Sequence, residues 1–586
     1  MRKAIRLILA VLPLLVTAAP LGAQKVDVVE KKLSNGMGLL VVRREGEATV
    51  AGGWVAHVGS SNERPGITGI SHLFEHMMFK GTPTIGTKDY KQDVAIIAQQ
   101  ERVRDEIRQE EAKMRAAYRR GEIDDLLKPE NKTPRLRELE KKFDELIAKQ
   151  RTVLVKNEFD RIYTTAGASG MNAFTNEDMT GYFITVPSNK VELWMWMESE
   201  RLLHPVFREF YAERDVVFEE RRLRTEATPL GKYEETFESM FWESHPYNWP
   251  VVGWPSDIPA ITKAQADAYY STYYAPQNIT LILVGDVDPG KVAATAERYF
   301  GRIPRGKNPV PEVVTLEVPQ QAEKRLNAEA ETNPQVDILW HTVPFGHADS
   351  YPLQVLAQIL STRTGRLYKG LVLGSQVATE AFARQESRKW AGLFNAGGEA
   401  KEGRKPEEVE QAIYAEIEKL KKEDVPAEEL QKVKNNFAAA EYRRLSSNFP
   451  ILVQLIVNGG RGDWHEVNAA GAKVQAVTAA DVKRVANKYF TKENRAVAIY
   501  TRKAGAVAAT EDPDLSGLDD RGKSMVKQVM QRIQTVEDPE RLRQMLGQME
   551  SQSAGASPEM KPAMDVIRKK VQARIDELEK SKGKKG

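Results

Sequence analysis

The segment His72-Leu73-Phe74-Glu75-His76 places two imidazoles and a carboxylate within five residues. On a helix, His72 and His76 project from the same face because they are four positions apart, so both can bind one metal ion. Zn²⁺ accepts nitrogen and oxygen ligands, and a catalytic zinc site has three protein ligands and an open position. Glu75 lies beside the histidines, where it can act on a metal-bound water. The pattern H-x-x-E-H therefore predicts a zinc site with Glu75 as the general base.

The residues around this segment favour a buried helix. Gly66 and Gly69 precede it, and the apolar side chains of Met77, Met78 and Phe79 follow it. Buried histidine and glutamate side chains need a polar partner, which a metal ion would supply. A solvated helix face that carries two histidines by chance is the alternative, and the apolar surroundings disfavour it.

An acidic stretch at residues 213–223 can supply a third metal ligand. Glu213 and Glu220 are seven residues apart, which is about two helical turns, so they share one face of a helix. Glu219 is the rival ligand, but it lies about 100° around the helix from Glu220.

Residues 59–82 closely resemble the pitrilysin/insulysin family of zinc peptidases, which includes the mitochondrial processing peptidases. In that family an E-x6-E helix follows the H-x-x-E-H segment. Its second glutamate binds zinc and its first supports the site. The resemblance implies that His72, His76 and Glu220 bind one Zn²⁺ per chain, and that Glu213 is the supporting carboxylate.

Residues 171–182 resemble the edge-strand motif of the same family, to which an extended substrate adds as a further strand. The part Asn172-Ala173-Phe174 would then meet the substrate backbone. Main-chain hydrogen bonds supply affinity in such strand addition, with little dependence on sequence. An ordinary half-buried strand with a polar turn is the alternative interpretation.

Composition limits the class of protein. The chain has 586 residues, too many for one hydrophobic core, and its hydrophobic and charged contents of 41% and 28% are typical of soluble proteins. A net charge of +3 gives no argument for nucleic-acid binding.

Residues 1–23 have the pattern of a secretory signal peptide. Arg2 and Lys3 supply positive charge, residues 5–16 are largely apolar, and small residues up to Ala23 suit cleavage. The apolar run is too short to span a membrane. Without cysteine there is no disulfide and no thiol for lipid attachment. We expect a soluble mature protein in a bacterial periplasm, and a retained N-terminal anchor is the alternative.

The remaining sequence predicts an α+β fold of two tandem homologous units, each an antiparallel sheet with helices packed on it. Residues 24–305 would form the zinc-bearing unit and 326–503 a degenerate second unit, joined by a proline-rich linker at 306–325. A strand at 336–342 and a helix at 351–360 repeat the order of the first unit, but without its catalytic residues. The family resemblance implies such a duplication.

Two segments lie outside this repeat. Residues 95–157 carry two apolar seams with heptad spacing on either side of a breaker at 128–134, which predicts an inserted antiparallel helical hairpin. We favour a solvated arm, and gating or partner docking are the alternatives. Residues 504–586 predict a helical C-terminal extension.

In the family, an arginine and a tyrosine seven residues apart in the second unit close over the substrate. Val372 and Thr379 stand at those positions here and cannot replace them, while Arg366 and Tyr368 are nearby but only two residues apart. Some bacterial members divide the work between a zinc-bearing chain and a companion that carries the arginine and tyrosine. This chain resembles the zinc-bearing member.

These observations predict a subunit of a zinc endopeptidase that hydrolyses unfolded or short peptides in a closed chamber. Its expected partner is a homologous subunit without zinc, with a homodimer as the alternative. A non-catalytic assembly or peptide-binding subunit is the competing function, but the intact zinc-site residues favour the enzyme.

Overall fold

The computed structural model describes residues 25–503 except 127 and 308, scattered residues between 515 and 547, and residues 561–583. The signal peptide expected at residues 1–23 lies outside the described residues. The chain divides into two compact units, Met1–Lys503 and Ala504–Gly586, so the expected C-terminal extension begins where the second unit begins. None of the described helices is long and apolar enough to cross a membrane.

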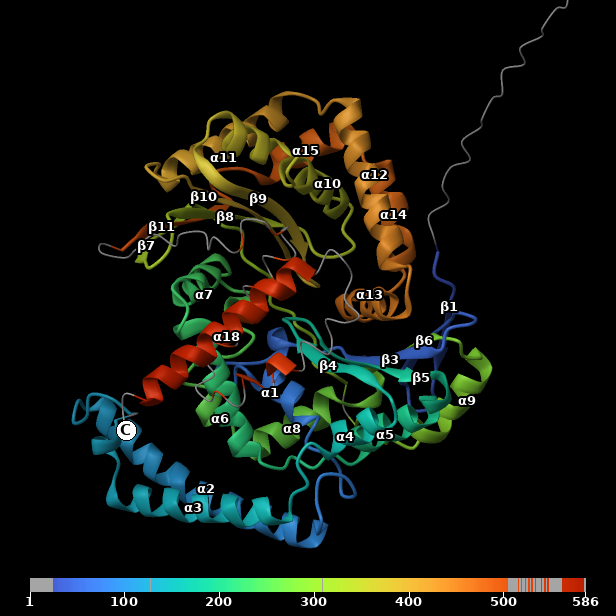
Figure 1. The fold of residues 1–586 in the computed structure, drawn as a ribbon, viewed down its shortest axis with the longest axis vertical. Helices are drawn as coiled ribbons and strands as arrows, with labels where there is room; N and C mark the ends of the chain where they lie inside the picture. Colours follow the sequence, from blue (N-terminus) through green and yellow to red (C-terminus); the bar gives the residue numbers. More distant parts are fainter. Residues whose placement is uncertain are drawn as a thin grey trace, which may run out of the picture. The chain divides into compact units, whose positions relative to one another are not determined.

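Two β-sheets organise the larger unit (Figure 1). The strand order is β1-β2-β6-β3-β5-β4 in the first sheet and β7-β11-β8-β10-β9 in the second. The first sheet consists of β1 (Val28–Lys32), β2 (Gly38–Arg43), β3 (Thr49–Ala56), β4 (Ser169–Thr175), β5 (Thr180–Pro187) and β6 (Ile279–Gly285). The second consists of β7 (Lys324–Ala330), β8 (Gln335–Thr342), β9 (Ala378–Ser387), β10 (Gly392–Ala400) and β11 (Arg495–Arg502).

The two sheets have the same topology. Strands β2 to β6 correspond in order to β7 to β11, and the first and last strand of each set pair in parallel. The remaining pairs within each set are antiparallel. The prediction of two tandem α/β units is therefore confirmed. The prediction that both sheets are wholly antiparallel is wrong, because each sheet contains one parallel pair of strands. Apolar periodicity shows which strands are buried but does not give the direction of their neighbours.

Helices surround both sheets. In the first half they are α1 (Ile70–Met77), α2 (Tyr90–Arg119), α3 (Pro134–Val153), α4 (Glu158–Thr165), α5 (Val191–Leu203), α6 (Phe210–Arg221), α7 (Gly231–Phe241), α8 (Lys263–Tyr273) and α9 (Pro289–Phe300). In the second half they are α10 (Ser350–Leu360), α11 (Pro406–Lys422), α12 (Ala427–Arg444), α13 (Asn448–Arg461), α14 (Glu466–Ala476) and α15 (Ala479–Tyr489). Helix α18 (Lys561–Gly583) belongs to the smaller unit. Helices α1 and α10 occupy the same place in the topology, after the second strand of each repeat.

The first sheet is buried on both faces. Trp54 of β3 stacks on Tyr182 of β5, with ring centroids 4.0 Å apart, in a core shared with helices of the first half. On the other face, Val55 and Ile282 belong to a second buried cluster with Ile456 and its neighbours on α13. Because α13 comes from the second half of the sequence, this cluster joins the two halves, and it explains why β3 and β6 are apolar at nearly every position.

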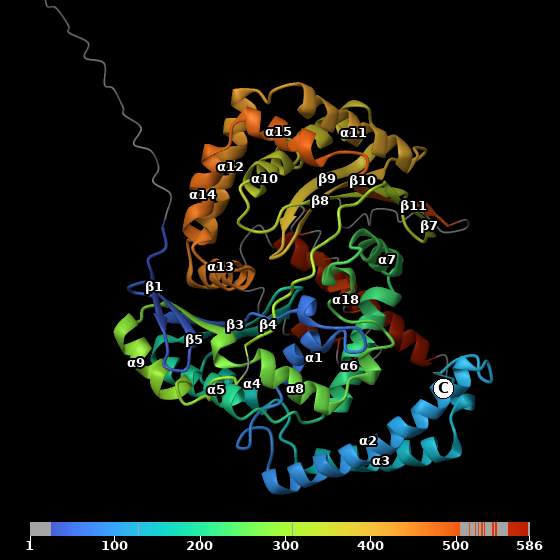
Figure 2. The same cartoon turned by 180° about the vertical axis from the view of Figure 1, so that it is seen from behind.

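Helices α2 and α3 run side by side as the inserted hairpin in both views (Figures 1 and 2), and α2 begins at Tyr90, earlier than expected. One face of this hairpin packs on α6. The rings of Phe143 and Tyr211 are 5.5 Å apart, and the Arg104 guanidinium lies 4.9 Å from the centre of the Tyr211 ring. The interpretation as a solvated arm is therefore wrong for this face, because its buried side chains share the core of the first half.

A buried cluster of polar side chains connects the start of α2 to the segment that follows α1. Asp93 at the start of α2 accepts hydrogen bonds from Arg208 Nε at 2.5 Å and from Gln150 Nε2 at 2.8 Å. Both Asp93 and Arg208 are almost completely buried. The remaining guanidinium nitrogens of Arg208 donate to the carbonyl oxygens of Lys80, Thr82 and Ile85. Arg208 thus connects the hairpin to the segment that follows α1.

The Asp93–Arg208 pair yields a stability prediction. Asp93→Asn leaves the Arg208 charge buried without its counterion, so we expect the free energy of unfolding to fall by about 3–5 kcal/mol. Urea unfolding of the full chain measures this. The matched control is Asp144→Asn on the exposed face of α3, which should change stability by no more than about 0.5 kcal/mol. Equal stability of the two variants would contradict the proposed anchoring role.

Candidate metal site

The structure brings His72, His76 and Glu220 together. One donor atom from each, two imidazole nitrogens and a carboxylate oxygen, lie within 4.8 Å of one another. His72 Nε2 is 3.7 Å from Glu220 Oε1, and His76 Nε2 is 3.4 Å from Glu220 Oε2. The histidines come from α1 and the glutamate from α6, which is in contact with α1. This donor set fits Zn²⁺, which prefers nitrogen and oxygen ligands in a three-residue catalytic site.

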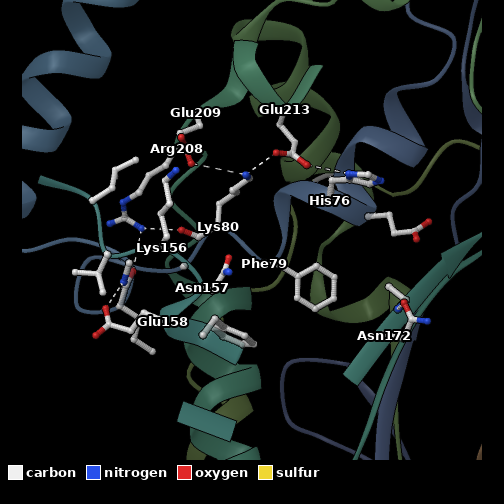
Figure 3. A pocket seen from close by; sticks show the side chains of 18 residues that line it. His76, Phe79, Lys80, Lys156, Asn157, Glu158, Asn172, Arg208, Glu209 and Glu213 are labelled. Carbon is white, nitrogen blue, oxygen red and sulfur yellow. Dashed lines mark hydrogen bonds and ion pairs between the residues drawn. The ribbon is translucent and has the colours of Figure 1, made fainter. Parts of the chain in front are cut away.

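Glu213 forms a hydrogen bond with the imidazole ring of His76. His76 Nδ1 lies 2.9 Å from Glu213 Oε1, and Lys80 Nζ lies 2.5 Å from Glu213 Oε2 (Figure 3). A hydrogen bond from Nδ1–H to a carboxylate fixes the ring orientation and leaves Nε2 for a metal ion. His72 Nδ1 is buried without a hydrogen-bond partner in the described part of the chain. The spacing of Glu213 and Glu220 thus brings one carboxylate to the metal position and the other behind His76.

Burial and neighbouring charges shift the pKa values of the titrating groups of the site. Burial lowers the pKa of His72, which favours the neutral imidazole that can bind a metal. Burial also lowers the pKa of His76, but the carboxylates of Glu213 and Glu220 outweigh it and raise that pKa to about 9. Burial raises the pKa of Glu75, against an opposing hydrogen bond from the Thr175 hydroxyl. A raised pKa suits a general base that has to accept and return a proton.

The N-terminus of α1 is fixed by residues that the sequence analysis did not identify. The carboxylate of Glu63 accepts hydrogen bonds from the backbone N–H groups of Gly69 and Ser71, each at 2.8 Å. These bonds satisfy donors that a helix N-terminus leaves unpaired. Gly69 has φ +89°, and a Cβ there would lie 2.4 Å from the carbonyl oxygen of Val252. Glu63 is six residues before Gly69, outside the usual capping distance, so no familiar sequence signal points to it.

Arg221, the neighbour of Glu220, anchors α6. Its guanidinium binds Glu235 of α7 through two contacts of 2.6 and 2.7 Å, and its Nη1 donates to the carbonyl oxygen of Gly253 at 2.9 Å. A Cβ on Gly253 would lie 2.3 Å from the carbonyl oxygen of Thr68, just before α1. The loop at Gly253 therefore contacts both α6 and the segment that leads into α1.

The edge strand lies next to this site. Strand β4, which carries Asn172, Ala173 and Phe174, is the last strand of the first sheet and is in contact with α1. Asn172 is exposed, Ala173 is buried and Phe174 is half-buried. Asn172 and Ala173 line a pocket of about 520 Å³ together with Glu75 and His76 (Figure 3). The pocket therefore joins the expected general base to the terminal strand of the sheet.

The other residues considered in the sequence analysis make contacts away from the donor cluster. Glu219 is exposed and pairs with Arg222 at 2.9 Å, away from the donor cluster. In the second half, Val372 packs on the core, and Thr379 Oγ1 donates to Glu399 Oε1 at 2.9 Å. Arg366 binds Glu429 through contacts of 3.0 and 2.7 Å.

Comparisons with known proteins place the chain among the M16 peptidases. Residues 39–100 match the family described as insulinase (peptidase family M16), and residues 260–437 match the peptidase M16 inactive domain. The zinc protease PqqE of Helicobacter pylori is 29% identical over 357 residues, 60% of this chain and 80% of that protein. The first match contains His72 to His76, and the second contains the positions of Val372 and Thr379.

Solved structures show the same fold. A protease from Helicobacter pylori superposes with a TM-score of 0.66 at 23% identity, covering 81% of this chain and 99% of that one. The periplasmic protease PqqL of Escherichia coli superposes with a TM-score of 0.59 at 16% identity, covering 83% of this chain and 49% of that one.

Metal analysis of purified variants tests the ligand assignment. We expect Glu75→Gln to retain one zinc per chain because Glu75 moves protons and does not bind the metal. His72→Ala, His76→Ala and Glu220→Gln should lose the metal because each removes one of three ligands. Zinc loss in Glu75→Gln, or full retention in Glu220→Gln, would refute the assignment.

Zinc titration separates the supporting carboxylate from its neighbours. Glu213→Gln should weaken zinc affinity by about 10–100-fold, since it removes the carboxylate that orients His76. Glu219→Gln is the matched control on the same helix and should bind zinc as the unaltered chain does. Equal affinities for the two variants would contradict the role of Glu213.

Proposed function

Because the chain belongs to the insulinase-like peptidase M16 family, we propose that it is the zinc-bearing subunit of an endopeptidase that cleaves unfolded or short peptides. The convergence of His72, His76 and Glu220 within one donor cluster is the observation that carries this proposal. The description of relatives such as PqqE as zinc proteases supports it.

Each residue of the site has a separate task in this proposal. His72, His76 and Glu220 would hold Zn²⁺, which when bound lowers the pKa of a coordinated water and polarises a carbonyl group. Glu75 takes a proton from the attacking water and returns it to the leaving amine. Glu213 keeps the His76 ring in its orientation.

Substrate binds as an added strand along the edge of β4. The position of β4 at the end of its sheet and in contact with α1 supports this, because an edge strand offers unpaired N–H and C=O groups. Such binding requires an extended peptide, so it selects unfolded or short substrates over folded proteins. The pocket beside Asn172 and Ala173 then receives a substrate side chain next to Glu75.

A partner subunit completes the catalytic chamber in this proposal. Val372 and Thr379 offer no charged or phenolic donor, and Arg366 is already bound to Glu429. A homologous chain without zinc would supply an arginine and a tyrosine in a heterodimer, and a homodimer is the alternative. The signal-like residues 1–23 and the periplasmic description of PqqL support a periplasmic location.

The second candidate function is a non-catalytic assembly or peptide-binding subunit. The match of residues 260–437 to an inactive domain is the observation that favours it. The two functions differ in one measurement, since only the enzyme shows peptide hydrolysis that needs both zinc and Glu75.

Hydrolysis assays with fluorogenic peptides test the enzyme and the partner together. We expect weak hydrolysis by the purified zinc-loaded chain, complete loss in Glu75→Gln, and a gain of at least about 10²-fold on mixing with the companion chain, because one oxyanion donor is worth that much. Size-exclusion chromatography should show a one-to-one complex. Full activity of this chain alone would remove the need for a companion. Zinc binding without any hydrolysis, alone or mixed, would favour the assembly function.

A further inference from the structure

Arg224 is a cation at the metal site that the mechanism above does not use. Its Nη1 lies 2.6 Å from Glu220 Oε1, the same oxygen that faces His72 Nε2 at 3.7 Å. The Arg224 side chain is 75% exposed and that of Glu220 is 19% exposed. The guanidinium therefore lies on the solvent side of Glu220.

The local backbone explains this position. Arg224 follows Glu220 by four residues, so the two side chains project from the same face. At Arg222, helix α6 passes into a single π-helical turn, η4 (Arg222–Glu226). Such turns are rare and occur frequently at functional sites. The buried Arg221 holds the backbone at this point through Glu235, whereas the side chain of Arg224 extends into solvent.

Arg214 and Arg222, which lie in or next to α6, contact other side chains instead of Glu220. Arg214 is buried and stacks on Tyr211 at 5.1 Å, and Arg222 pairs with Glu219. The charge of Arg224, in contrast, acts on the site itself: burial lowers the pKa of His72 and Arg224 adds to this, whereas burial raises the pKa of Glu75 and Arg224 opposes that rise. Arg224 is thus within electrostatic reach of both a metal ligand and the general base.

The reaction needs a donor of this kind. Attack of water on a peptide carbonyl places negative charge on the carbonyl oxygen, and a preorganised donor aimed at that oxygen lowers the barrier. A guanidinium has five N–H groups in a fixed fork, so Arg224 can keep one contact with Glu220 and still donate to a second oxygen. The second half of the chain offers Val372 and Thr379 at the positions of such donors.

We propose that Arg224 donates a hydrogen bond to the carbonyl oxygen of the scissile peptide bond and to the oxyanion formed from it. This inference rests on the proposed peptidase function. The water oxygen forms a bond to the carbonyl carbon, and the carbonyl π electron pair moves to the oxygen that faces Arg224. When the C–N bond breaks, that pair restores the carbonyl, and the amine leaves with the proton from Glu75.

This donor belongs to the zinc-bearing chain itself and adds to any that a partner supplies. It accounts for the weak hydrolysis expected of the lone chain, which should therefore depend on Arg224.

Kinetics of the zinc-loaded full chain test the inference first. Arg224→Gln should reduce kcat by about 10²-fold with little change in KM, because the contact strengthens as charge develops on the oxygen. Arg224→Lys should retain part of the rate, since it keeps the charge but loses the fork. Arg222→Gln, an exposed arginine two residues away, is the control and should behave as the unaltered chain does. Zinc content should be one per chain in all variants.

Ligand binding gives a second test that does not require turnover. A phosphinic pseudopeptide of alanine and phenylalanine carries a tetrahedral anionic centre, whereas its CH₂–NH analogue has no oxygen at that position. Calorimetry should show Arg224→Gln weakening the phosphinic ligand by about the factor lost in kcat, with the CH₂–NH analogue unchanged. Arg222→Gln should change neither affinity.

Two results would overturn the inference. The first is phosphinic affinity in Arg224→Gln equal to that of the unaltered chain. The second is zinc loss in parallel with activity, which would make Arg224 a residue that only positions Glu220. Failure of the peptidase function itself is a different outcome, in which no chain hydrolyses peptide, and the phosphinic series still decides the role of Arg224.

Discussion

The fixed separation of two short helices, α1 and α6, is the constraint on which the site depends. Each carries only part of the donor set, and the two are distant in sequence. A functional constellation of this kind has to be held within about 0.5 Å. Buried polar contacts provide that precision, namely Glu63 at the start of α1, and Arg221 with Glu235 and Gly253 at the end of α6. Because buried hydrogen bonds and ion pairs restrict side-chain and backbone motion, these contacts hold α1 and α6 in place.

The inserted hairpin helps to fix the positions of α1 and α6. It packs on α6 through Tyr211 and reaches the segment after α1 through Arg208. It therefore contacts the surroundings of both ligand-bearing helices without contributing a ligand of its own. The second half also contacts the first sheet, since α13 covers one of its faces. The second half thus supports the first through its packing surface.

Some of this was predictable from sequence because it depends on local spacing. The four-residue step from His72 to His76 and the seven-residue step from Glu213 to Glu220 each place side chains on one helix face, and the structure brings these faces together. The Arg224–Glu220 pair has the same four-residue spacing and could have been found in the same way. The strand expected at 336–342 from its apolar pattern is likewise present, as β8.

What the sequence did not reveal depends on contacts between distant segments. The sequence around Arg221 does not indicate that Gly253 lies beside it. The heptad pattern of the hairpin likewise does not indicate that Tyr211, from α6, packs against Phe143 of α3. The parallel pairing of β2 with β6 could not be predicted either, because the apolar periodicity of a strand does not indicate which strand lies beside it or in which direction.

The position of the last strand in each repeat has a consequence for synthesis. Strand β6 lies between β2 and β3, although Gly38 of β2 has to wait for Thr280 to emerge before it can pair. At about 5–20 residues per second, translation takes on the order of 10–50 s to cover that interval. During this time β2 and β3 each have an unpaired apolar edge, which is a template for aggregation. The second sheet repeats the arrangement with β11 between β7 and β8. The nascent chain therefore cannot close either sheet until its final strand has been made.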